Sequence, residues 1–229
     1  MNARAGAASP LDPEAIADAI DRQLRALAEP TTAAMRRVRI DYSRCLRTHS
    51  ASDVLAVAEA LAERHRWVAY ELLYYHPSKL AQLDLAAVER LGRGISSWGA
   101  VDAFARYISG PAWRLGLIAD ANVQCWAASP DRWWRRAALV STVPLNLRAA
   151  GGTGDSTRTL DICARLAADR DDMVVKALSW ALREMVLWDP DGVRAFLAAH
   201  DAVLAPRVRR EVNHKLASGL KNPTRRPLA

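Results

Sequence analysis

The sequence predicts an all-α protein in which pairs of helices repeat along the chain. Apolar residues recur at spacings of three and four throughout, and no stretch alternates apolar and polar residues as a half-buried strand does. Stretches that combine aromatic and basic residues begin about 30 to 41 residues apart, which matches the period of two-helix HEAT units. Stacked units of this kind curve into a solenoid. We therefore expect a right-handed superhelical solenoid of HEAT-like helix pairs.

The N-terminal helices have recognisable boundaries. Pro13 suits the first turn of a helix that runs to about Ala28 and stops before Pro30. Thr31 or Thr32 supplies the hydroxyl that caps the next helix.

A capping box opens the third helix. Ser50 is followed three residues later by Asp53, which stands in place of the usual Glu. The amphipathic helix that follows is expected from Val54 to about Arg64.

The remaining helices form the loose repeat. The aromatic and basic members are expected over Trp67 to His76, Ser97 to Ile108, Trp134 to Val143 and Val175 to Leu187, each beside a plainer helix. A glycine-rich loop, residues 151–154, joins the third and fourth of them. We expect a disordered lead over residues 1–10, one HEAT-like domain over 11–220 and a basic flexible tail over 221–229.

Composition narrows the classes of function. Of 229 residues, 32 are Lys or Arg and 25 are Asp or Glu, so the net charge is +7, carried largely by arginine, whose planar fork suits phosphate. No apolar run is long enough to span a membrane. Cys45, Cys125 and Cys163 are far apart, and the five histidines are scattered without partners at metal spacing. We expect a cytoplasmic monomer that binds nucleic acid and needs no metal or other cofactor.

One pair of residues is unusual for a packed core. Trp98 and Asp102 are four apart, so on a helix they project from the same face. An indole face and a carboxylate both attract positive charge, whereas a core avoids an unpaired charge. This spacing favours a surface that receives a cation. Trp180, in the later run Lys176 to Glu184, occurs in a similar setting.

Three motifs occur in the order found in a known family. They are Trp98-x-x-x-Asp102, the run Asp131-Arg132-Trp133-Trp134-Arg135-Arg136-Ala137-Ala138, and the stretch from Asp171 to Glu184. The chain resembles the AlkD-like DNA alkylation repair glycosylases, which are HEAT-like solenoids, over roughly Trp67 to Asn222. It departs from the family where an aromatic-rich run often precedes the second helix and this chain reads Ala28 to Thr32, and Arg135 makes its site more basic than in some relatives.

The resemblance implies an activity and residues for it. It implies hydrolysis of the N-glycosidic bond of N7- or N3-alkylated purines in double-stranded DNA, with the lesion left stacked in the duplex. In that picture Trp98 and Trp180 lie against the deoxyribose, Asp102 lies beside the anomeric carbon, and Arg136 contacts the phosphate backbone. The other candidates for phosphate contact are Arg132, Arg135, Lys176 and Arg183.

Other interpretations of these residues stay open. Arg183 and Glu184 also suit a structural ion pair, and Asp171 and Asp172 suit the start of a helix better than catalysis. The alternative function is that of a non-catalytic HEAT-repeat protein, which binds damaged or branched DNA without breaking a bond. A scaffold for protein partners is a third reading. Packing between helices is expected for Trp67, Trp113, Trp126, Trp133 and Trp188.

Overall fold

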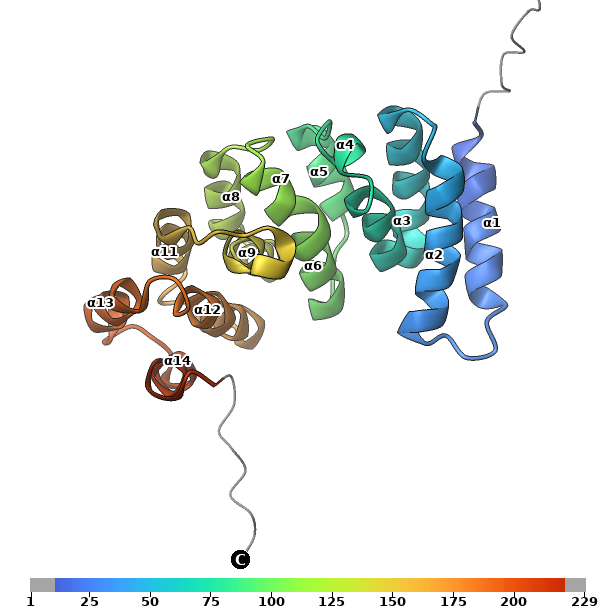
Figure 1. The fold of residues 1–229 in the computed structure, drawn as a ribbon. Coiled ribbons are helices and arrows are strands. Elements are labelled where there is room, and N and C mark those ends of the chain that lie inside the picture. The colour runs from blue at the N-terminus through green and yellow to red at the C-terminus, as the bar shows by residue number, and fades with distance from the viewer. Residues whose placement is uncertain (1–10, 221–229) are drawn as a thin grey trace, which may run out of the picture. The chain divides into compact units, whose positions relative to one another are not determined.

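The structure is a computed structural model that describes residues 11–220, and every regular element in that range is helical (Figure 1). The predicted all-α class is confirmed. The described residues form two compact units, one up to Leu80 and the other from Ala81 onward. A single domain over 11–220 and a superhelical solenoid stay predictions. The lead over 1–10 and the tail over 221–229 lie outside the described residues.

The first unit contains four α-helices: α1 (Pro13–Arg25), α2 (Thr32–Leu46), α3 (Ala51–Tyr74) and α4 (Pro77–Leu80). Helix α1 ends at Arg25, three residues before the predicted Ala28. Thr31 caps α2 by accepting from the backbone N–H of Ala34 at 3.2 Å. The predicted capping box is present at the start of α3, with Ser50 and Asp53 each accepting from the other's backbone at 3.1 Å.

Helix α3 joins two helices that the sequence analysis separated. The backbone at His65 leaves the helical region, with φ −139° and ψ 65°, so the helix has a kink there. The ring Nε2 of His65 lies 2.7 Å from Oδ1 of Asp21 on α1, which ties the kink to the neighbouring helix. The helices predicted from Val54 and from Trp67 are therefore the two halves of one helix that bends at His65.

The second unit continues with shorter helices. They are α5 (Leu85–Gly92), α6 (Trp98–Phe104), α7 (Gly110–Arg114), α8 (Asp120–Ala127), α9 (Arg132–Ser141), α10 (Val143–Asn146), α11 (Ser156–Arg165), α12 (Asp172–Met185), α13 (Pro190–His200) and α14 (Pro206–Ser218). A π turn, Ala105–Ser109, connects α6 to α7, and a 3₁₀ turn, Arg148–Ala150, precedes the predicted loop over 151–154.

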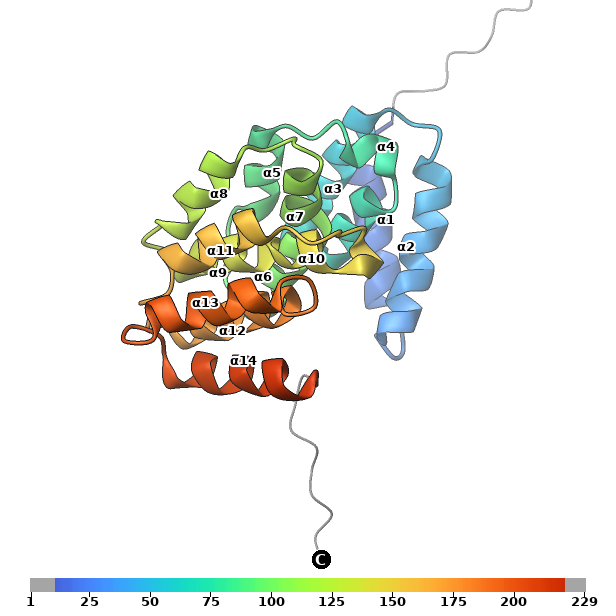
Figure 2. The ribbon, with the colours of Figure 1, turned by 60° about the vertical axis from the view of Figure 1, so that its left-hand side comes forward.

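Helices of the second unit lie in two rows. Helix α9 packs against α6 on one side and α12 on the other, and α12 packs against α14. The partners α8, α11 and α13 form the second row, where α11 contacts both of the others (Figures 1 and 2). This arrangement places α6, α9 and α12 side by side, so that residues from three distant stretches share one surface.

The core of the second unit is apolar and aromatic. Phe104, Ile108 and Leu139 are completely buried. Among the tryptophans expected to pack between helices, Trp113 and Trp126 are buried, and Trp67, Trp133 and Trp188 are half-buried. None of the helices in the described part of the chain is long and apolar enough to cross a membrane.

Candidate active site

The centre of the candidate site is an ion pair between α6 and α9. Arg136 donates from Nε to Oδ1 of Asp102 and from Nη2 to Oδ2, both at 2.9 Å. Its Nη1 donates to the backbone carbonyl oxygen of Met173, in the first turn of α12, at 2.5 Å. The pair is a bidentate fork, the strongest geometry that Arg and a carboxylate adopt. Arg136 therefore joins all three helices.

Burial sets the electrostatics of this pair. The side chain of Arg136 is 6 % exposed and that of Asp102 is 21 % exposed. Burial raises the pKa of the Asp102 carboxyl above its usual range, and the Arg136 guanidinium opposes that shift only in part. Asp102 thus keeps about a fifth of its side chain exposed, while both of its oxygens accept from Arg136.

Trp98 stands at the open side of the same helix. It is the first residue of α6, and Ser97 caps the helix by accepting from the backbone N–H of Ala100 at 3.3 Å. The Trp98 side chain is 63 % exposed, whereas most large apolar residues of this unit are buried. Because Trp98 and Asp102 are one turn apart, they share a face. Trp98 is therefore a surface residue and not part of the core.

A stripe of half-buried residues follows the length of α12. Its members are Met173, Lys176, Trp180, Arg183 and Glu184, and the residues between them are buried. Met173 and Trp180 are seven residues apart, which is close to two helical turns, so both face the same way. Arg136 bonds to the backbone of Met173 in the first turn of α12, whereas Trp180 lies two turns further along that helix, beside Arg183, Glu184 and Lys215. Its Nε1 donates to Oε1 of Glu184 at 3.0 Å, which fixes the ring.

The structure gives carboxylate partners to all the basic residues that the sequence predicted as phosphate contacts. Besides Arg136, Arg132 reaches Asp171 at 3.5 Å, Arg135 reaches Asp169 at 2.7 Å, Lys176 reaches Asp172 at 2.6 Å and Arg183 reaches Glu211 at 3.5 Å. Arg132 and Lys176 are 52 % and 38 % exposed, whereas Arg135 and Arg183 are only 19 % and 14 % exposed. These acidic partners moderate the positive field of the surface, and their pairing keeps the cations ordered.

Sequence reasoning missed most of these acidic partners. Asp169 pairs with Arg135 on α9, and Glu211 and Asp172 each pair with a cation on a neighbouring helix as well as with one on their own. A separation of about thirty residues hides such a pair between helices in a single sequence. The roles predicted for Asp171 and Asp172 as helix cap and first-turn acid are confirmed, because Asp171 accepts from the backbone N–H of Met173 at 2.8 Å. The structural ion pair predicted for Arg183 is present, and its partner is Glu211 on α14.

No cluster of three or more His, Cys, Asp or Glu side chains within residues 11–220 is arranged to hold a metal ion.

The fold and the site together define an all-helical protein in which a carboxylate paired with an arginine lies one turn from an exposed tryptophan. A family model described as DNA alkylation repair enzyme matches residues 21–216, which is most of the 229-residue chain. The protein belongs to the family of DNA alkylation repair enzymes. Comparison with curated proteins and with solved structures finds no match.

Proposed function

We propose that the protein is a monofunctional DNA glycosylase that hydrolyses the N-glycosidic bond of N7- or N3-alkylated purines in duplex DNA, without flipping the base. The observation that carries the proposal is the Asp102 carboxylate, which Arg136 holds at a partly open surface on the face that also bears the exposed Trp98 ring. The family match supports DNA repair as the setting.

The proposed reaction needs little help at the leaving group. An alkylated purine is already cationic, so the C1′–N bond breaks with its electron pair passing to the purine, and positive charge develops on the deoxyribose. Asp102 faces this oxocarbenium ion, and the oxygen of a water molecule then bonds to C1′ while its proton passes to the carboxylate or to solvent. A carboxylate about 4 Å from the cation supplies on the order of 4 kcal/mol at an effective dielectric of about 20. That corresponds to roughly a thousandfold in rate.

Trp98 and Trp180 add to this stabilisation in the proposal. Each indole face contributes about 0.5 to 2 kcal/mol to a nearby cation. Trp180 is held by Glu184 through its Nε1–H, so its ring presents a fixed face. The sum remains modest by the standard of enzymes, and it suits only substrates whose bond is already weakened. We therefore expect no release of uncharged bases such as uracil.

The small size of the hollow at Trp180 supports a mechanism without base flipping. The hollow lined by Trp180, Arg183, Glu184 and Lys215 has a volume of about 40 Å³, which is too small for a purine. An enzyme that flips its target base encloses that base in a fitted pocket. A stacked lesion, with its deoxyribose against the Trp98 and Asp102 face, needs no such pocket. Phosphate contacts are assigned to Arg132, Arg135, Arg136, Lys176 and Arg183.

Base release from a defined duplex tests the proposal. Wild-type protein is mixed with duplex DNA carrying one N7-methylguanine, and free base is measured under single-turnover conditions against a protein-free control. Asp102→Asn is expected to lower the enzyme-dependent rate roughly a thousandfold, because it removes the charge facing the sugar. Asp161→Asn, which makes the same change at a carboxylate that pairs with Arg165 on α11, is the matched control and keeps the rate. Unchanged release by Asp102→Asn refutes the assignment.

A non-catalytic protein that binds damaged or branched DNA is the alternative. One observation favours it: both oxygens of Asp102 already accept from Arg136. Tight binding to a duplex with N7-methylguanine, without release of base from any cationic lesion, would establish this alternative. A weak affinity for duplex and branched DNA alike, even at low salt, counts against both functions.

A further inference from the structure

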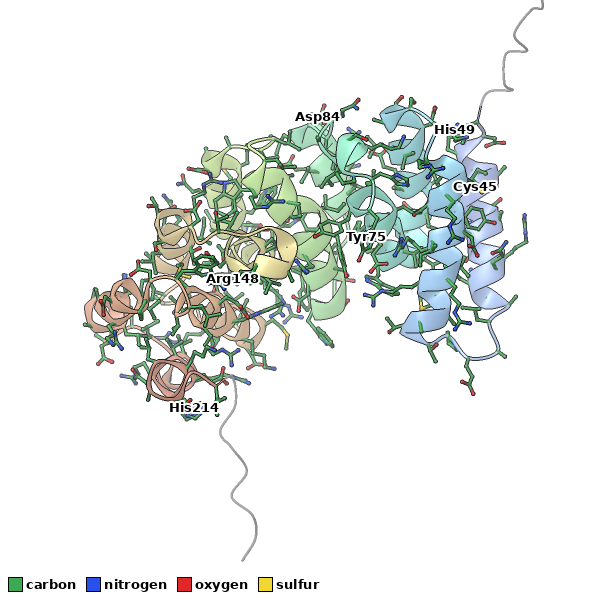
Figure 3. All side chains as sticks on the ribbon, viewed as in Figure 1. Cys45, His49, Tyr75, Asp84, Arg148 and His214 are labelled. Atoms are coloured by element: carbon green, nitrogen blue, oxygen red, sulfur yellow. The ribbon has the colours of Figure 1, made fainter. Side chains whose placement is uncertain are left out.

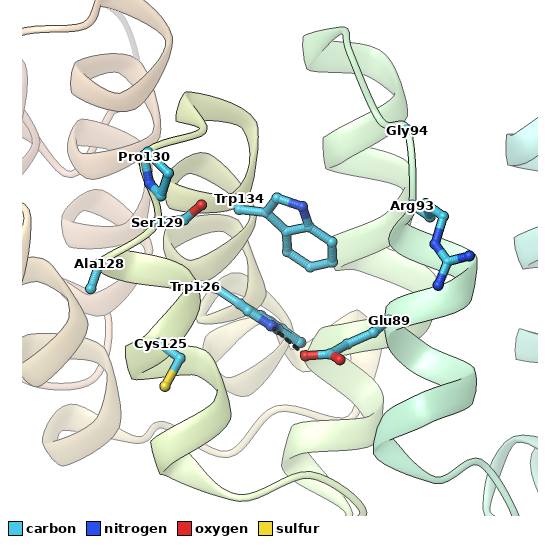
Figure 4. Close-up of a pocket in the computed structure, with 9 residues that line it drawn as sticks. All are labelled: Glu89, Arg93, Gly94, Cys125, Trp126, Ala128, Ser129, Pro130 and Trp134. Atoms are coloured by element: carbon cyan, nitrogen blue, oxygen red, sulfur yellow. Dashed lines mark hydrogen bonds between the residues drawn. The ribbon is translucent and has the colours of Figure 1, made fainter.

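A pocket of about 580 Å³ opens between the ends of α5 and α8 and the start of α9 (Figure 4). The indoles of Trp126 and Trp134 line it, and Glu89 and Arg93 bring one carboxylate and one guanidinium to it. Ligand pockets in proteins have volumes of roughly 300 to 1,000 Å³ and combine apolar walls with a few polar groups. By size and composition this pocket belongs to that class.

The aromatic wall is formed before any ligand arrives. The Trp126 and Trp134 rings lie 5.2 Å apart, and Phe104 packs behind them at 6.2 and 5.9 Å. The Nε1–H of Trp126 donates to Oε1 of Glu89 at 3.2 Å, which orients the carboxylate as well as the ring (Figure 4). Gly92 leaves the room that the Trp134 ring occupies, because a Cβ there would lie 2.6 Å from its Cη2 atom. A ligand therefore meets a rigid wall.

The pocket lies on the far side of α6 and α9 from the candidate active site. Phe104 follows Asp102 by two residues, and Trp134 precedes Arg136 by two. Residues two apart on a helix project about 200° from one another, so they do not share a face. Accordingly Phe104 and Trp134 pack together on one side, while Asp102 and Arg136 pair on the other. The pocket therefore opens away from the face that the proposed function assigns to the deoxyribose.

The indole and carboxylate groups of the pocket favour an occupant with a positive charge. An indole face attracts a cation placed over it, and a carboxylate strengthens that attraction. Flat rings stack on indole with a large contact area, and the half-buried Trp134 offers that face, because Trp126 is only 6 % exposed. Arg93 brings a guanidinium to the same rim. Its positive charge offsets part of the attraction from Glu89, so the indole face decides the preference for a cation, and its N–H groups favour a ligand that also carries an oxygen acceptor. We propose that this pocket binds a heteroaromatic cation of purine size, with an N-alkylated purine nucleoside as its representative ligand.

The proposal is independent of base release by Asp102, and the chain supplies its own reporter. Cys125 is exposed and lines the pocket, whereas Cys45 is exposed on α2 in the other unit (Figure 3). Burial raises the pKa of the Cys163 thiol, so this third cysteine reacts slowly. The full-length protein is alkylated with iodoacetamide in the presence of 7-methylguanosine, at a pH where its ring keeps the positive charge, and each cysteine is followed by peptide mass spectrometry.

The expected result is a saturable slowing of the Cys125 reaction by 7-methylguanosine, with Cys45 unaffected. Uncharged guanosine is expected to bind about tenfold more weakly, since it lacks the attraction to the ring and carboxylate. Equal protection by guanosine overturns the assignment of a cation. The absence of saturable protection at millimolar nucleoside overturns the pocket itself.

Substitutions separate this pocket from the candidate active site, which also attracts cations. Glu89→Gln keeps an oxygen to accept from Trp126 and removes the charge, so the affinity for 7-methylguanosine is expected to fall about tenfold with the fold intact. Trp134→Leu removes the stacking face. Glu63→Gln, the same change at an exposed position on α3, is the matched control. Binding that survives Glu89→Gln and Trp134→Leu but is lost in Asp102→Asn places the nucleoside at the candidate active site and overturns this proposal.

Discussion

At the scale of single residues, Arg136 has a larger structural part than the family resemblance implies. Its guanidinium makes three hydrogen bonds inside the protein, two to Asp102 and one to Met173, and its side chain is 6 % exposed. A guanidinium carries five N–H groups, so two remain for a phosphate oxygen. Arg136 therefore holds the Asp102 carboxylate in place, and only its two remaining N–H groups could make the proposed phosphate contact.

Replacement of Arg136 separates these two roles. Arg136→Gln leaves Asp102 without its bidentate partner, and we expect the free energy of unfolding to fall by about 3 kcal/mol, measured by urea denaturation. The rate of base release at saturating protein is expected to fall more than the affinity for DNA, because the carboxylate loses its position.

A double-mutant cycle with Asp102→Asn controls for simple loss of charge. Arg136 and Asp102 touch, so a coupling energy of about 1 to 3 kcal/mol in stability is expected. An additive pair, with no coupling, contradicts the assignment of Arg136 as the group that positions Asp102.

The raised pKa of Asp102 predicts a shifted acid limb of activity. A carboxyl with a raised pKa binds its proton more tightly in the folded protein, so folding gains stability as pH falls through that pKa, and above it the charged group costs stability. Base release requires the charged form, so the rate is expected to fall at a pH above the roughly 3.9 of an ordinary Asp. Arg136→Gln removes the influence that lowers this pKa, and the midpoint is expected to move further up. Single-turnover rates across pH, each corrected for spontaneous depurination, measure it.

The sequence predicted some of these residues and could not predict others. The spacing of Trp98 and Asp102 showed that they share a helical face, because that depends only on local geometry. The pairing of Asp102 with Arg136 depends on which helices become neighbours, thirty-four residues apart, and no local pattern carries that information. The pocket wall of Trp126 and Trp134 was missed for the same reason.

At the scale of elements, local signals predicted where helices begin better than how they continue. The capping box at Ser50 and the Asp171 cap are short-range hydrogen bonds, and both occur as expected. The kink at His65 and the π turn after α6 were not predicted, since packing between helices decides them. The π turn directly follows the helix that carries Asp102, where a single α-helix was expected to run from Ser97 to Ile108.

Helix α12 gives a prediction of its own. The carboxylate of Asp172 lies 2.6 Å from Lys176 and 3.5 Å from Arg207 on α14, and these partners hold its pKa below its usual range. Asp172→Asn removes a negative charge beside Lys176, which the proposed function assigns to phosphate contact, and beside Arg207. We expect the affinity for duplex DNA at low salt to rise about two- to fivefold. Fluorescence anisotropy over a range of salt concentrations measures this gain.

The salt dependence provides the control for that experiment. An electrostatic gain shrinks as salt rises, and a gain that persists unchanged at high salt indicates a rearranged surface instead. Asp191→Asn, at an exposed carboxylate that pairs with Arg194 on α13, makes the same charge change on a different helix and is expected to leave the affinity nearly unaltered.

At the scale of the whole molecule, every residue assigned to the reaction lies in the second unit, while the family match at 21–216 extends through both. The net charge of +7 is spread over arginines that are largely paired with acids in each unit, so net charge alone is a poor guide to the DNA-facing surface. Composition indicated nucleic acid, and only the placement of the ion pairs shows which cations keep exposed surface.

The first unit has a buried ion-pair cluster around Glu71. Disrupting this cluster tests whether the two units lose stability independently of each other. Glu71 is 1 % exposed and accepts from Arg36 and Arg39, of which Arg39 is itself buried. Glu71→Gln leaves Arg39 as a buried charge without its counter-charge, at an expected cost of about 3 kcal/mol. We expect hydrogen–deuterium exchange to quicken over residues 11–80 and to stay unchanged from residue 81 onward, while base release at saturating protein keeps its rate. Glu63→Gln, at an exposed position of α3, is the control and leaves both measurements alone. Faster exchange throughout the chain contradicts this division, because it shows that the two units open together.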